Sequence, residues 1–505
     1  MNFVVNLEYQ RYVPLYRRLS DALRKAILEG RLKPGDAIPS VRDMATTFRL
    51  SRATVLKSLE DLHKQGFLET IHGSGTYVKK RWPGDLSDLL PPRELEASDA
   101  QTDRSAQLSA YGRRVTALCQ AESKEWNVHL PQINFGGPPL NLTPMREWKA
   151  LLLKHSKGND LQELTYIVEP CGYPMLREAI AAYLHRLRAV RARADQVITF
   201  SSKQLRLDLI ARVLLEPGDC VGFEEPGYSE ARVALASHGA EIVPIPVDGD
   251  GLNVDYLLAL PLKFKLVYVT PSHHDPTGAV LSLERRRQLI AWAKRTGAYI
   301  IEDDYDCEYR YGRKPLPSLQ GLDGGDCVIY LASLWKIMFQ ALRFGFIIVP
   351  ERLRSVCVLA KTQSERYLPV LEQLALSDLI NEGHLERHLR KTQGALARHR
   401  QALIYALTKH AGGRVRLAPE SAGMHVLIEI DTDLSDDAVL RLAYEARVPL
   451  ISTRAHYMGA PRKGEFVLSF AEIHESTIES CIQRWMELME EYSAGGRIRT
   501  NENRA

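Results

Sequence analysis

Apolar side chains recur every fourth position near the start of the chain. They are Leu15, Leu19, Leu23 and Ile27. This spacing places the four side chains on one face of a helix. Pro14 stands where proline favours helix entry and Gly30 favours an end, so the pattern predicts one amphipathic helix between them.

Two shorter helices are predicted after the turn at residues 33–36. The first has a capping-box-like start, because Ser40 stands three residues before Asp43, and Ser51 can cap the second. Their inward faces are Val41, Met44, Ala45 and Phe48, and then Val55, Leu59 and Leu62. Only two residues separate Phe48 from Ser51, and helices joined this tightly predict a helix-turn-helix unit.

The last of these helices turns a polar face to solvent. At 100° per residue, Ala53 and Lys57 lie opposite the buried stripe, and Ser51, Arg52 and Thr54 lie in the exposed first turn. That end of a recognition helix normally enters the major groove of DNA. Residues 67–71 and 76–80 predict two strands of a wing around the turn His72-Gly73-Ser74-Gly75. A small helical bundle with a hairpin is the alternative.

Charge supports the DNA-binding interpretation. The 505 residues carry a formal net charge of +4, but residues 1–82 hold 15 Lys and Arg against 8 Asp and Glu, which is +7 and leaves −3 for the remainder. A basic segment on a mildly acidic chain favours contact with a polyanion. A surplus of this size is also compatible with an ordinary solvated surface.

The amino-acid sequence of this segment resembles the GntR class of bacterial winged-helix regulators over residues 12–80. The similar motifs are Ile38-Pro39-Ser40-Val41-Arg42, Ser51-Arg52-Ala53-Thr54-Val55, Gly66-Phe67-Leu68 and His72-Gly73-Ser74-Gly75-Thr76-Tyr77-Val78. The DNA-binding residues expected from the resemblance and the exposed helix face are Arg42, Ser51, Arg52, Thr54, Lys57, His72 and Gly73. Ser51 alternatively only caps its helix, and Gly73 only makes the turn.

Apolar runs alternate with helical stretches from about residue 131 to residue 491. The runs are residues 196–200, 220–224, 241–247, 266–270, 298–303, 328–331 and 345–349. Their near-continuous hydrophobicity is typical of parallel strands covered on both faces. We therefore expect an α/β domain with a mostly parallel sheet, and a smaller α+β lobe after Pro350.

These patterns divide the chain into four parts. We expect a winged helix-turn-helix domain at residues 12–80, a flexible linker at residues 81–128, an α/β domain at residues 129–492 and a polar tail at residues 493–505. The linker is rich in proline and polar residues, with one short helix expected near residues 111–120.

Polar side chains follow two of the predicted strands. Asp303 and Tyr305 end one of them, and Lys336 lies just beyond another, with Arg343 seven residues later. A carboxylate, a phenol, a lysine and an arginine are the groups that hold pyridoxal phosphate. Taken singly, each residue has an ordinary alternative as a strand-end cap, a core residue or a solvated charge.

These four residues, in this order, resemble the cofactor site of the fold-type-I aminotransferases. The flanking motifs resemble the MocR/GabR regulatory branch of that family, in which a GntR-like domain precedes an aminotransferase-like domain. The motifs are Glu225-Pro226-Gly227-Tyr228, Thr270-Pro271-Ser272-His273, Pro276-Thr277-Gly278, Asp303-Asp304-Tyr305-Asp306 and Gly383-His384-Leu385-Glu386-Arg387-His388.

The resemblance implies roles at pyridoxal 5'-phosphate. Lys336 would be the catalytic residue and form a Schiff base with the cofactor, Asp303 would bind the ring nitrogen, Tyr305 the ring hydroxyl, and Tyr228 would stack on the ring. Ser202, Lys203, Gln204, Ser333 and Arg343 would bind the phosphate. Asp275 would lie beside the ring hydroxyl, and Tyr166 would reach the phosphate of the partner subunit in a homodimer.

Four positions depart from the aminotransferase pattern. Asp275 replaces an asparagine that donates to the ring hydroxyl, and an ionised carboxylate cannot donate. Trp335 stands where a small hydroxyl residue is common, and Lys203 adds a charge to the phosphate loop. Val467 takes the place of the arginine that grips a substrate carboxylate.

We therefore expect a transcription regulator that binds DNA and pyridoxal phosphate and senses the cofactor or a small amine or amino acid. The alternatives are an active aminotransferase with a DNA-binding domain, and a DNA-binding protein whose second domain is a cofactor-free dimerisation scaffold. The seven cysteines include no Cys-x-x-Cys pair, so no metal site is expected, and a reducing cytoplasm is favoured. No signal peptide or membrane span is expected.

Overall fold

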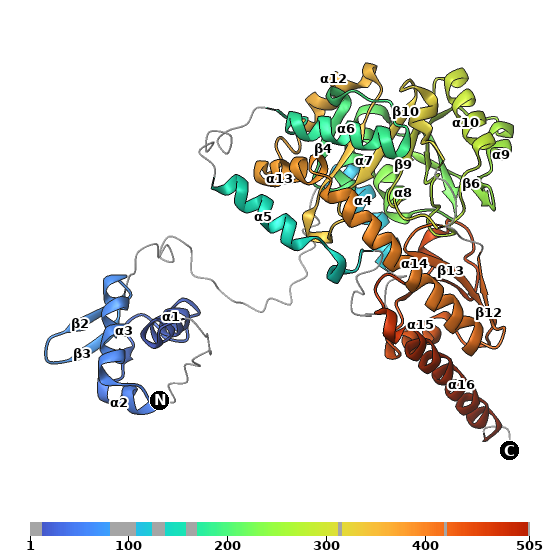
Figure 1. Ribbon diagram of the computed structural model, residues 1–505. Helices are drawn as coiled ribbons and strands as arrows, with labels where there is room; N and C mark the ends of the chain where they lie inside the picture. Colours follow the sequence, from blue (N-terminus) through green and yellow to red (C-terminus); the bar gives the residue numbers. More distant parts are fainter. Residues whose placement is uncertain are drawn as a thin grey trace. The chain divides into compact units, whose positions relative to one another are not determined.

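The computed structural model describes residues 13–80, 108–123, 137–157, 169–311, 316–418 and 422–502. The chain forms two compact units, Met1–Ser105 and Ala106–Ala505 (Figure 1). We call the described part of the first unit, residues 13–80, the head, and the described part of the second unit, residues 108–502, the body.

The head is a winged helix-turn-helix domain, as predicted. Its elements are α1 (Leu15–Leu28), β1 (Ala37–Ile38), α2 (Val41–Thr47), α3 (Arg52–Lys64), β2 (Leu68–Ile71) and β3 (Gly75–Val78). The strands form an antiparallel sheet in the order β1-β3-β2. The short strand β1 was not predicted. It pairs with β3, and its Ile38 is part of the core of the head.

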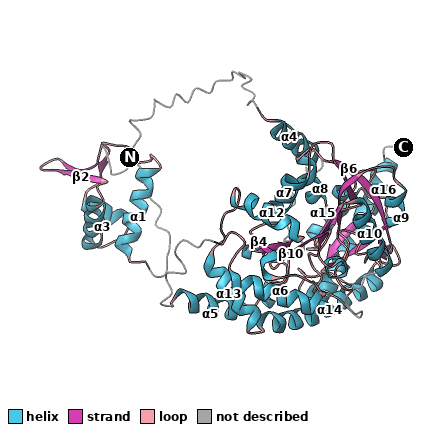
Figure 2. Cartoon of the chain, turned by 90° about the horizontal axis from the view of Figure 1, so that it is seen from above, coloured by secondary structure: helices cyan, strands magenta, loops and turns pink. Residues whose placement is uncertain are grey.

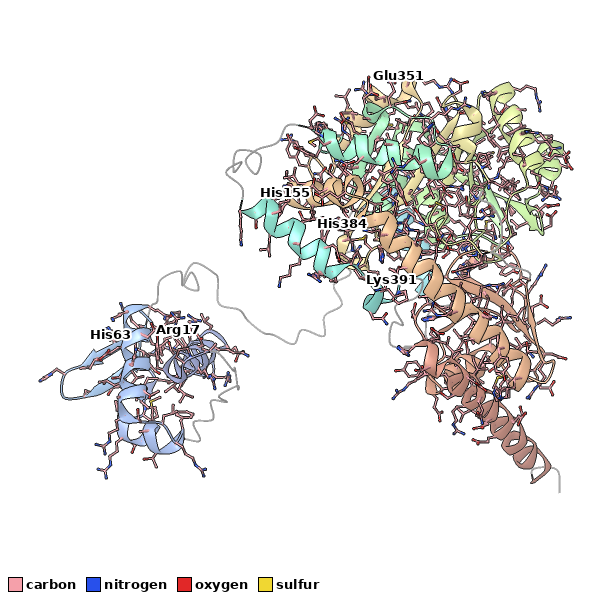
Figure 3. The ribbon with its side chains drawn as sticks, in the orientation of Figure 1. Arg17, His63, His155, Glu351, His384 and Lys391 are labelled. Atoms are coloured by element: carbon pink, nitrogen blue, oxygen red, sulfur yellow. The ribbon has the colours of Figure 1, made fainter. Side chains whose placement is uncertain are left out.

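The head has its own small core, which includes Leu19, Leu23, Met44, Val55 and Leu62. Two serine hydroxyls fix the helix starts: Ser40 Oγ accepts from the Asp43 N–H at 3.2 Å, and Ser51 Oγ accepts from the Thr54 N–H at 3.1 Å. Polar side chains surround this core, among them Arg17 on α1 and His63 near the end of α3 (Figure 3). The predicted caps are therefore confirmed. The inward stripes are confirmed too, except that Leu15, in the first turn of α1, is 51% exposed.

The body is built on an eight-stranded sheet in the order β4-β11-β10-β9-β8-β5-β6-β7. The strands are β4 (Val197–Phe200), β5 (Cys220–Glu225), β6 (Glu241–Asp248), β7 (Gly251–Leu252), β8 (Phe264–Val269), β9 (Tyr299–Asp303), β10 (Val328–Ser333) and β11 (Gly345–Ile348). The seven predicted runs are all strands of this sheet, and five of them, in β10, β9, β8, β5 and β6, are parallel neighbours.

One prediction about strand direction was wrong. The run at residues 345–349 forms β11, which is antiparallel to both of its neighbours, β10 and β4. The connection from Ser333 to Gly345 contains only the short 3-10 helix Gln340–Leu342. A parallel return needs a crossover of a dozen or more residues, usually with a helix, so this connection favours an antiparallel neighbour.

Helices cover both faces of the sheet (Figure 2). On one face lie α7 (Lys203–Leu214), α8 (Ser229–Ser237) and α12 (Glu351–Thr362), which share a core with Ile198 and Phe200 of β4. The other face packs on α6 (Pro174–Arg188) and α13 (Val370–Asn381) through side chains such as Val197. A third core joins β8 and β9 to α9 (Val254–Ala259), α10 (Leu283–Thr296) and α11 (Leu319–Asp323).

A smaller α+β lobe follows, as predicted. Its antiparallel sheet has the order β12-β13-β15-β14, with β12 (Val415–Leu417), β13 (His425–Ile430), β14 (Leu450–Ser452) and β15 (Glu465–Ser469). The lobe's helices are α14 (His384–His410), α15 (Asp436–Glu445) and α16 (Ile478–Glu502). Helix α16 therefore extends into the segment assigned to a polar tail.

Two further helices lie at the edges of the body. Helix α4 (Ala110–Ser123) confirms the helix expected near residues 111–120; its Arg114 Nε donates to the carbonyl of Ser237 in α8 at 2.9 Å. Helix α5 (Met145–Ser156) carries His155 (Figure 3). His155 Nε2 lies 2.8 Å from Asp378 Oδ2 of α13, which joins the two helices. No helix of the described ranges combines the length and hydropathy required to cross a membrane.

Candidate functional site

The exposed side of α3 and the wing carry the residues predicted to bind DNA. Arg42, Arg52, Lys57, His72 and Gly73 are exposed, and Thr54 is half-buried. The hydroxyl of Ser51 already caps α3 and lies 2.8 Å from the hydroxyl of Thr54. The cap role of Ser51 is therefore visible in the fold, whereas Arg52, the first residue of α3, projects from the same turn with an exposed cationic side chain.

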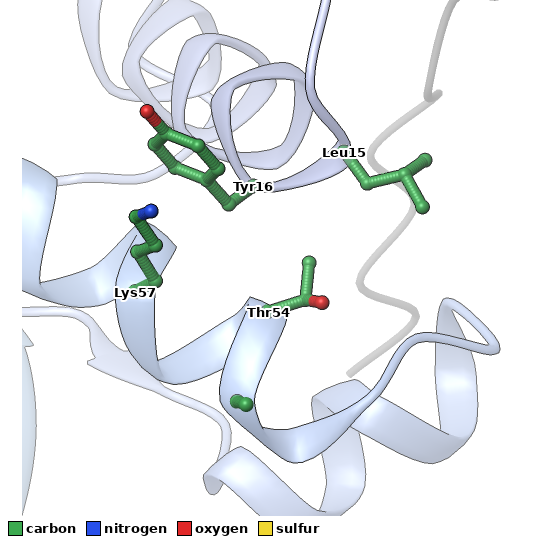
Figure 4. A pocket seen from close by; sticks show the side chains of 5 residues that line it. Leu15, Tyr16, Thr54 and Lys57 are labelled. Atoms are coloured by element: carbon green, nitrogen blue, oxygen red, sulfur yellow. The ribbon is translucent and has the colours of Figure 1, made fainter.

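A shallow hollow of about 330 Å³ lies between the start of α1 and the outer face of α3 (Figure 4). It is lined by Leu15, Tyr16, Ala53, Thr54 and Lys57. The Lys57 ammonium lies 4.2 Å from the centre of the Tyr16 ring, a cation–π contact. Lys57 is thus held against α1 while its positive charge stays on the surface of the predicted recognition helix.

In the body, sheet order brings the predicted cofactor residues to one edge. Strands β9 and β10 are adjacent and parallel, so Asp303 at the end of β9 lies close to Ser333, which ends β10, and to Lys336 just beyond it. Gly345 of β11 pairs with both Ser333 and Phe200, the last residue of β4. The loop that begins α7, with Ser202 and Lys203, therefore starts at the same edge. Ligands of open α/β sheets bind at such carboxyl ends.

The Tyr305 ring lies near two lysine ammonium groups. Lys336 Nζ and Lys203 Nζ are each 5.5 Å from its centre. Lys336 Nζ is also 4.6 Å from the centre of the Trp335 ring. Burial lowers the pKa of Lys336, and the charge of Lys203 lowers it further, although Asp306 opposes the shift. A lysine whose amine is more readily neutral is a better nucleophile toward a carbonyl.

Asp303 is the buried carboxylate of this edge. Tyr268 donates its hydroxyl to Asp303 Oδ2 at 2.5 Å, and Lys203 Nζ lies 2.8 Å from the same oxygen. The Lys203 ammonium also lies 4.1 Å from the centre of the Tyr228 ring. Asp303 and the face of Tyr228 thus bind one cation together.

The N-terminus of α7 provides an anion-binding geometry. Ser202 caps the helix by accepting from the Leu205 N–H at 3.2 Å, and the first N–H groups of a helix attract anions. The buried guanidinium of Arg206, one turn further on, donates to Ser333 Oγ at 2.6 Å and to the Phe346 carbonyl at 3.1 Å. Burial lowers the pKa of Arg206 to about 10.

Arg206 was missed by the sequence analysis because it lies on a helix face that otherwise packs in the core. Gly345 makes room for it: a Cβ there would lie 2.8 Å from the guanidinium. The sequence does not show that Gly345 and Arg206 are neighbours, because this depends on how β11 pairs with β10 and β4.

Arg343 and Gln204 are placed differently from the other predicted cofactor residues. Arg343 is exposed with a φ of 46° and makes no ion pair within the described ranges. Gln204 donates to Glu230 Oε2 at 2.8 Å, and Tyr228 donates its hydroxyl to the same oxygen at 2.5 Å. Tyr166 lies outside the described residues.

Two histidines of the smaller lobe, His456 and His425, lie near Asp275. His456, in the 3-10 helix Arg454–His456 of the smaller lobe, has Nε2 3.3 Å from Asp275 Oδ1. Burial alone would raise the pKa of Asp275, but the hydrogen bond from His456 and the nearby positive charges lower it overall. His273 Nδ1 lies 2.9 Å from Asp306 Oδ2 and 3.0 Å from the Tyr305 hydroxyl. The rings of His273 and His425 are 4.7 Å apart.

The position expected to carry a carboxylate-binding arginine is apolar. Val467 lies in β15, an inner strand of the smaller sheet, pairs with Leu427 and Ile451, and is 1% exposed. The edge as a whole can hold a cationic ring nitrogen on Asp303, present the amine of Lys336 to a carbonyl carbon, and bind a dianion at α7. Val467 offers nothing to a substrate carboxylate.

Comparison with known proteins agrees with both units. Residues 137–484 match the family aminotransferase class I and II, and residues 15–78 match the bacterial regulatory proteins of the gntR family. The body is similar to the α-aminoadipate aminotransferase LysN of Thermus thermophilus, solved in complex with N-(5'-phosphopyridoxyl)-L-leucine. The TM-score is 0.68 at 25% identity, covering 77% of this chain and 100% of LysN.

Two curated relatives match this chain over nearly the whole of both sequences. The chain is 32% identical over 474 residues to the probable rhizopine catabolism regulatory protein MocR of Rhizobium meliloti, covering 93% of this chain and 92% of the relative. It is 27% identical over 470 residues to the pyridoxine biosynthesis transcriptional regulator PdxR of Corynebacterium glutamicum, covering 93% of each. The body is thus an aminotransferase-like domain and the head a GntR-class domain. The chain belongs to the MocR/GabR family of transcription regulators.

Proposed function

We propose that the body binds pyridoxal 5'-phosphate through Lys336 and senses this cofactor or a small amine or amino acid, and that the head transmits the response to double-stranded DNA. The observation that carries the proposal is the gathering of Asp303, Tyr305 and Lys336 at one sheet edge together with the apolar Val467. The cofactor groups are kept, while the usual anchor for a substrate carboxylate is replaced.

The residues present fit the cofactor. Asp303 is buried and already binds a cation, as a protonated ring nitrogen requires, and Tyr228 offers a ring face beside it. The N-terminus of α7, Ser333 and the buried cation of Arg206 suit a phosphate dianion. Bound pyridoxal phosphate supplies an aldehyde that condenses with amines and a ring that withdraws electrons.

Two buried polar atoms, one near Lys336 and one near Asp275, leave capacity for a further ligand. Asp306 Oδ1 and His456 Nδ1 are buried and have no hydrogen-bond partner among the described residues. The other carboxylate oxygen of Asp306 lies 2.9 Å from His273 Nδ1, and the other ring nitrogen of His456 lies 3.3 Å from Asp275 Oδ1. An amine or hydroxyl of an effector would satisfy such atoms, because buried polar groups are normally hydrogen-bonded.

The relatives support the two halves of the proposal. PdxR is named for the regulation of pyridoxine biosynthesis, and LysN was solved with a pyridoxyl compound. For the head, the exposed first turn of α3 with Arg52, and Arg42 before it, supports insertion into the major groove, with His72 and Gly73 of the wing beside the backbone. By the same family relation we propose a homodimer in which Tyr166 of one subunit reaches the partner's phosphate.

Absorbance of the purified full chain tests the cofactor half. Titration with pyridoxal phosphate should produce a band near visible wavelengths, and borohydride reduction should leave a pyridoxyl group on Lys336. Lys336→Ala should lose both, whereas Lys263→Ala, at an exposed lysine of the same domain, should keep both. Rapid repeated transfer of amino groups between an amino acid and a keto acid would contradict the sensing role and favour a working aminotransferase.

A further inference from the structure

Lys203 binds the two groups that the proposed function assigns to the cofactor ring. Its ammonium is 2.8 Å from Asp303 Oδ2 and 4.1 Å from the centre of the Tyr228 ring, and its side chain is 13% exposed. Asp303 is 2% exposed, so the pair is nearly removed from water. An ion pair in such surroundings is screened much less than one at the surface.

The Lys203 ammonium and the pyridine ring of the cofactor would bind the same two groups, the Asp303 carboxylate and the Tyr228 ring. A protonated ring nitrogen needs the Asp303 carboxylate, and the flat ring needs the face of Tyr228. Both positions are within about 4 Å of Lys203 Nζ. Because two cations cannot share one buried carboxylate and one ring face without repulsion, binding of the ring requires the Lys203 ammonium to leave Asp303.

The position of Lys203 in the chain offers the displaced ammonium another partner. Lys203 is the first residue of α7, directly after the cap Ser202, where the free N–H groups favour an anion. A phosphate bound at this terminus would lie beside the base of the Lys203 side chain and attract its ammonium. A ligand with a ring but no phosphate would offer no such compensation.

We propose that Lys203 is a specificity-determining residue that makes the site select the phosphorylated form of pyridoxal. The ammonium competes with the ring for Asp303 and Tyr228, and only a ligand that carries a phosphate restores the lost ion pair. This inference rests on the proposed binding of pyridoxal phosphate, and it concerns selection between two forms of the ligand.

Calorimetric titration of the full chain with pyridoxal phosphate and, separately, with pyridoxal tests the inference. In Lys203→Met the affinity for pyridoxal should rise about tenfold, the size of a ~1.4 kcal/mol coupling, because the competitor is gone. The affinity for pyridoxal phosphate should stay equal or fall, so that the ratio of the two affinities drops at least about tenfold. Lys203→Gln should behave in the same way, and Lys263→Met should match the wild type.

The outcomes separate the two proposals. If the wild-type chain binds pyridoxal phosphate but Lys203→Met and Lys203→Gln bind pyridoxal no more tightly, the selectivity role is wrong and the proposed function stands. If the wild type binds neither ligand, both proposals fall. A pyridoxyl group found on Lys203 after borohydride reduction of the wild type would also overturn the inference, because Lys203 would then be an attachment point.

Discussion

Glu224 is a buried carboxyl group that is surrounded by neutral donors. It is 2% exposed, and its Oε2 accepts from the N–H of Thr270 at 3.0 Å and from the Thr270 hydroxyl at 2.7 Å. His274 Nε2 lies 3.5 Å away, but burial lowers the pKa of His274 to about 3, so this ring is neutral near pH 7. Burial raises the pKa of Glu224 to about 8, against the hydrogen bonds from Thr270.

This shift predicts how stability depends on pH. Between the unfolded pKa of about 4.3 and the folded value of about 8, the native state holds a proton that the unfolded state has lost, so the free energy of unfolding falls as the pH rises through this window. Glu224→Gln keeps an acceptor for Thr270 and removes the titration. We expect the variant to equal the wild type near pH 4.5 and to be more stable by ~1–3 kcal/mol at pH 8. Denaturant unfolding at several pH values measures this, and a constant difference across pH would contradict it.

The sequence could predict the position of some residues of the candidate site but not of others. Asp303 and Lys336 follow apolar runs, so their position at a strand end could be inferred from the chain alone. Arg206 and His456 could not, since each reaches the site through a partner far along the chain: Ser333 for Arg206 and Asp275 for His456. Contacts of this kind depend on the tertiary packing of different elements.

At the scale of elements, α3 carries a serine whose two expected roles can be separated. Ser51 Oγ accepts from the Thr54 N–H, and the same residue is predicted to meet DNA. Ser51→Ala should lose ~1 kcal/mol of stability in the head. Ser51→Asp keeps a cap of similar strength but places a negative charge beside the expected phosphates.

Hydrogen exchange of the α3 amides and titration with operator DNA distinguish these roles. We expect faster exchange in Ser51→Ala only, and a greater loss of DNA affinity in Ser51→Asp than in Ser51→Ala. If the aspartate variant bound DNA as well as the wild type does, the first turn of α3 would not face the phosphates.

The elements themselves were predicted where one periodicity dominates. Helices α1 and α3 have regular apolar stripes, and the central strands have continuous apolar runs. Strand β1 has only two residues, Ala37 and Ile38, and it exists through its pairing with β3. The reversed direction of β11 likewise depends on its neighbours, because an apolar run has no polarity along the chain.

At the scale of the whole molecule, charge and chemistry lie on different units. The excess positive charge falls in residues 1–82, at 15 − 8 = +7, whereas the groups that suit the cofactor lie beyond residue 200 in the body. The head has a hydrophobic core of its own, which includes no residue of the body. Each half of the proposed function can therefore be removed separately.

Two variants of the full chain should show this separation. Arg52→Ala should weaken operator binding by ~1–3 kcal/mol, with a smaller salt dependence if Arg52 contacts a phosphate, and it should keep the absorbance band formed with pyridoxal phosphate. Lys336→Ala should lose the band and bind operator DNA in a manner that no longer changes when pyridoxal phosphate is added. In the wild type the same addition should change the operator affinity, because a ligand that prefers one conformation of the body shifts the population of the whole chain. A response to pyridoxal phosphate that survives in Lys336→Ala would place the sensing step outside Lys336, and unchanged DNA binding by Arg52→Ala would remove α3 from the interface.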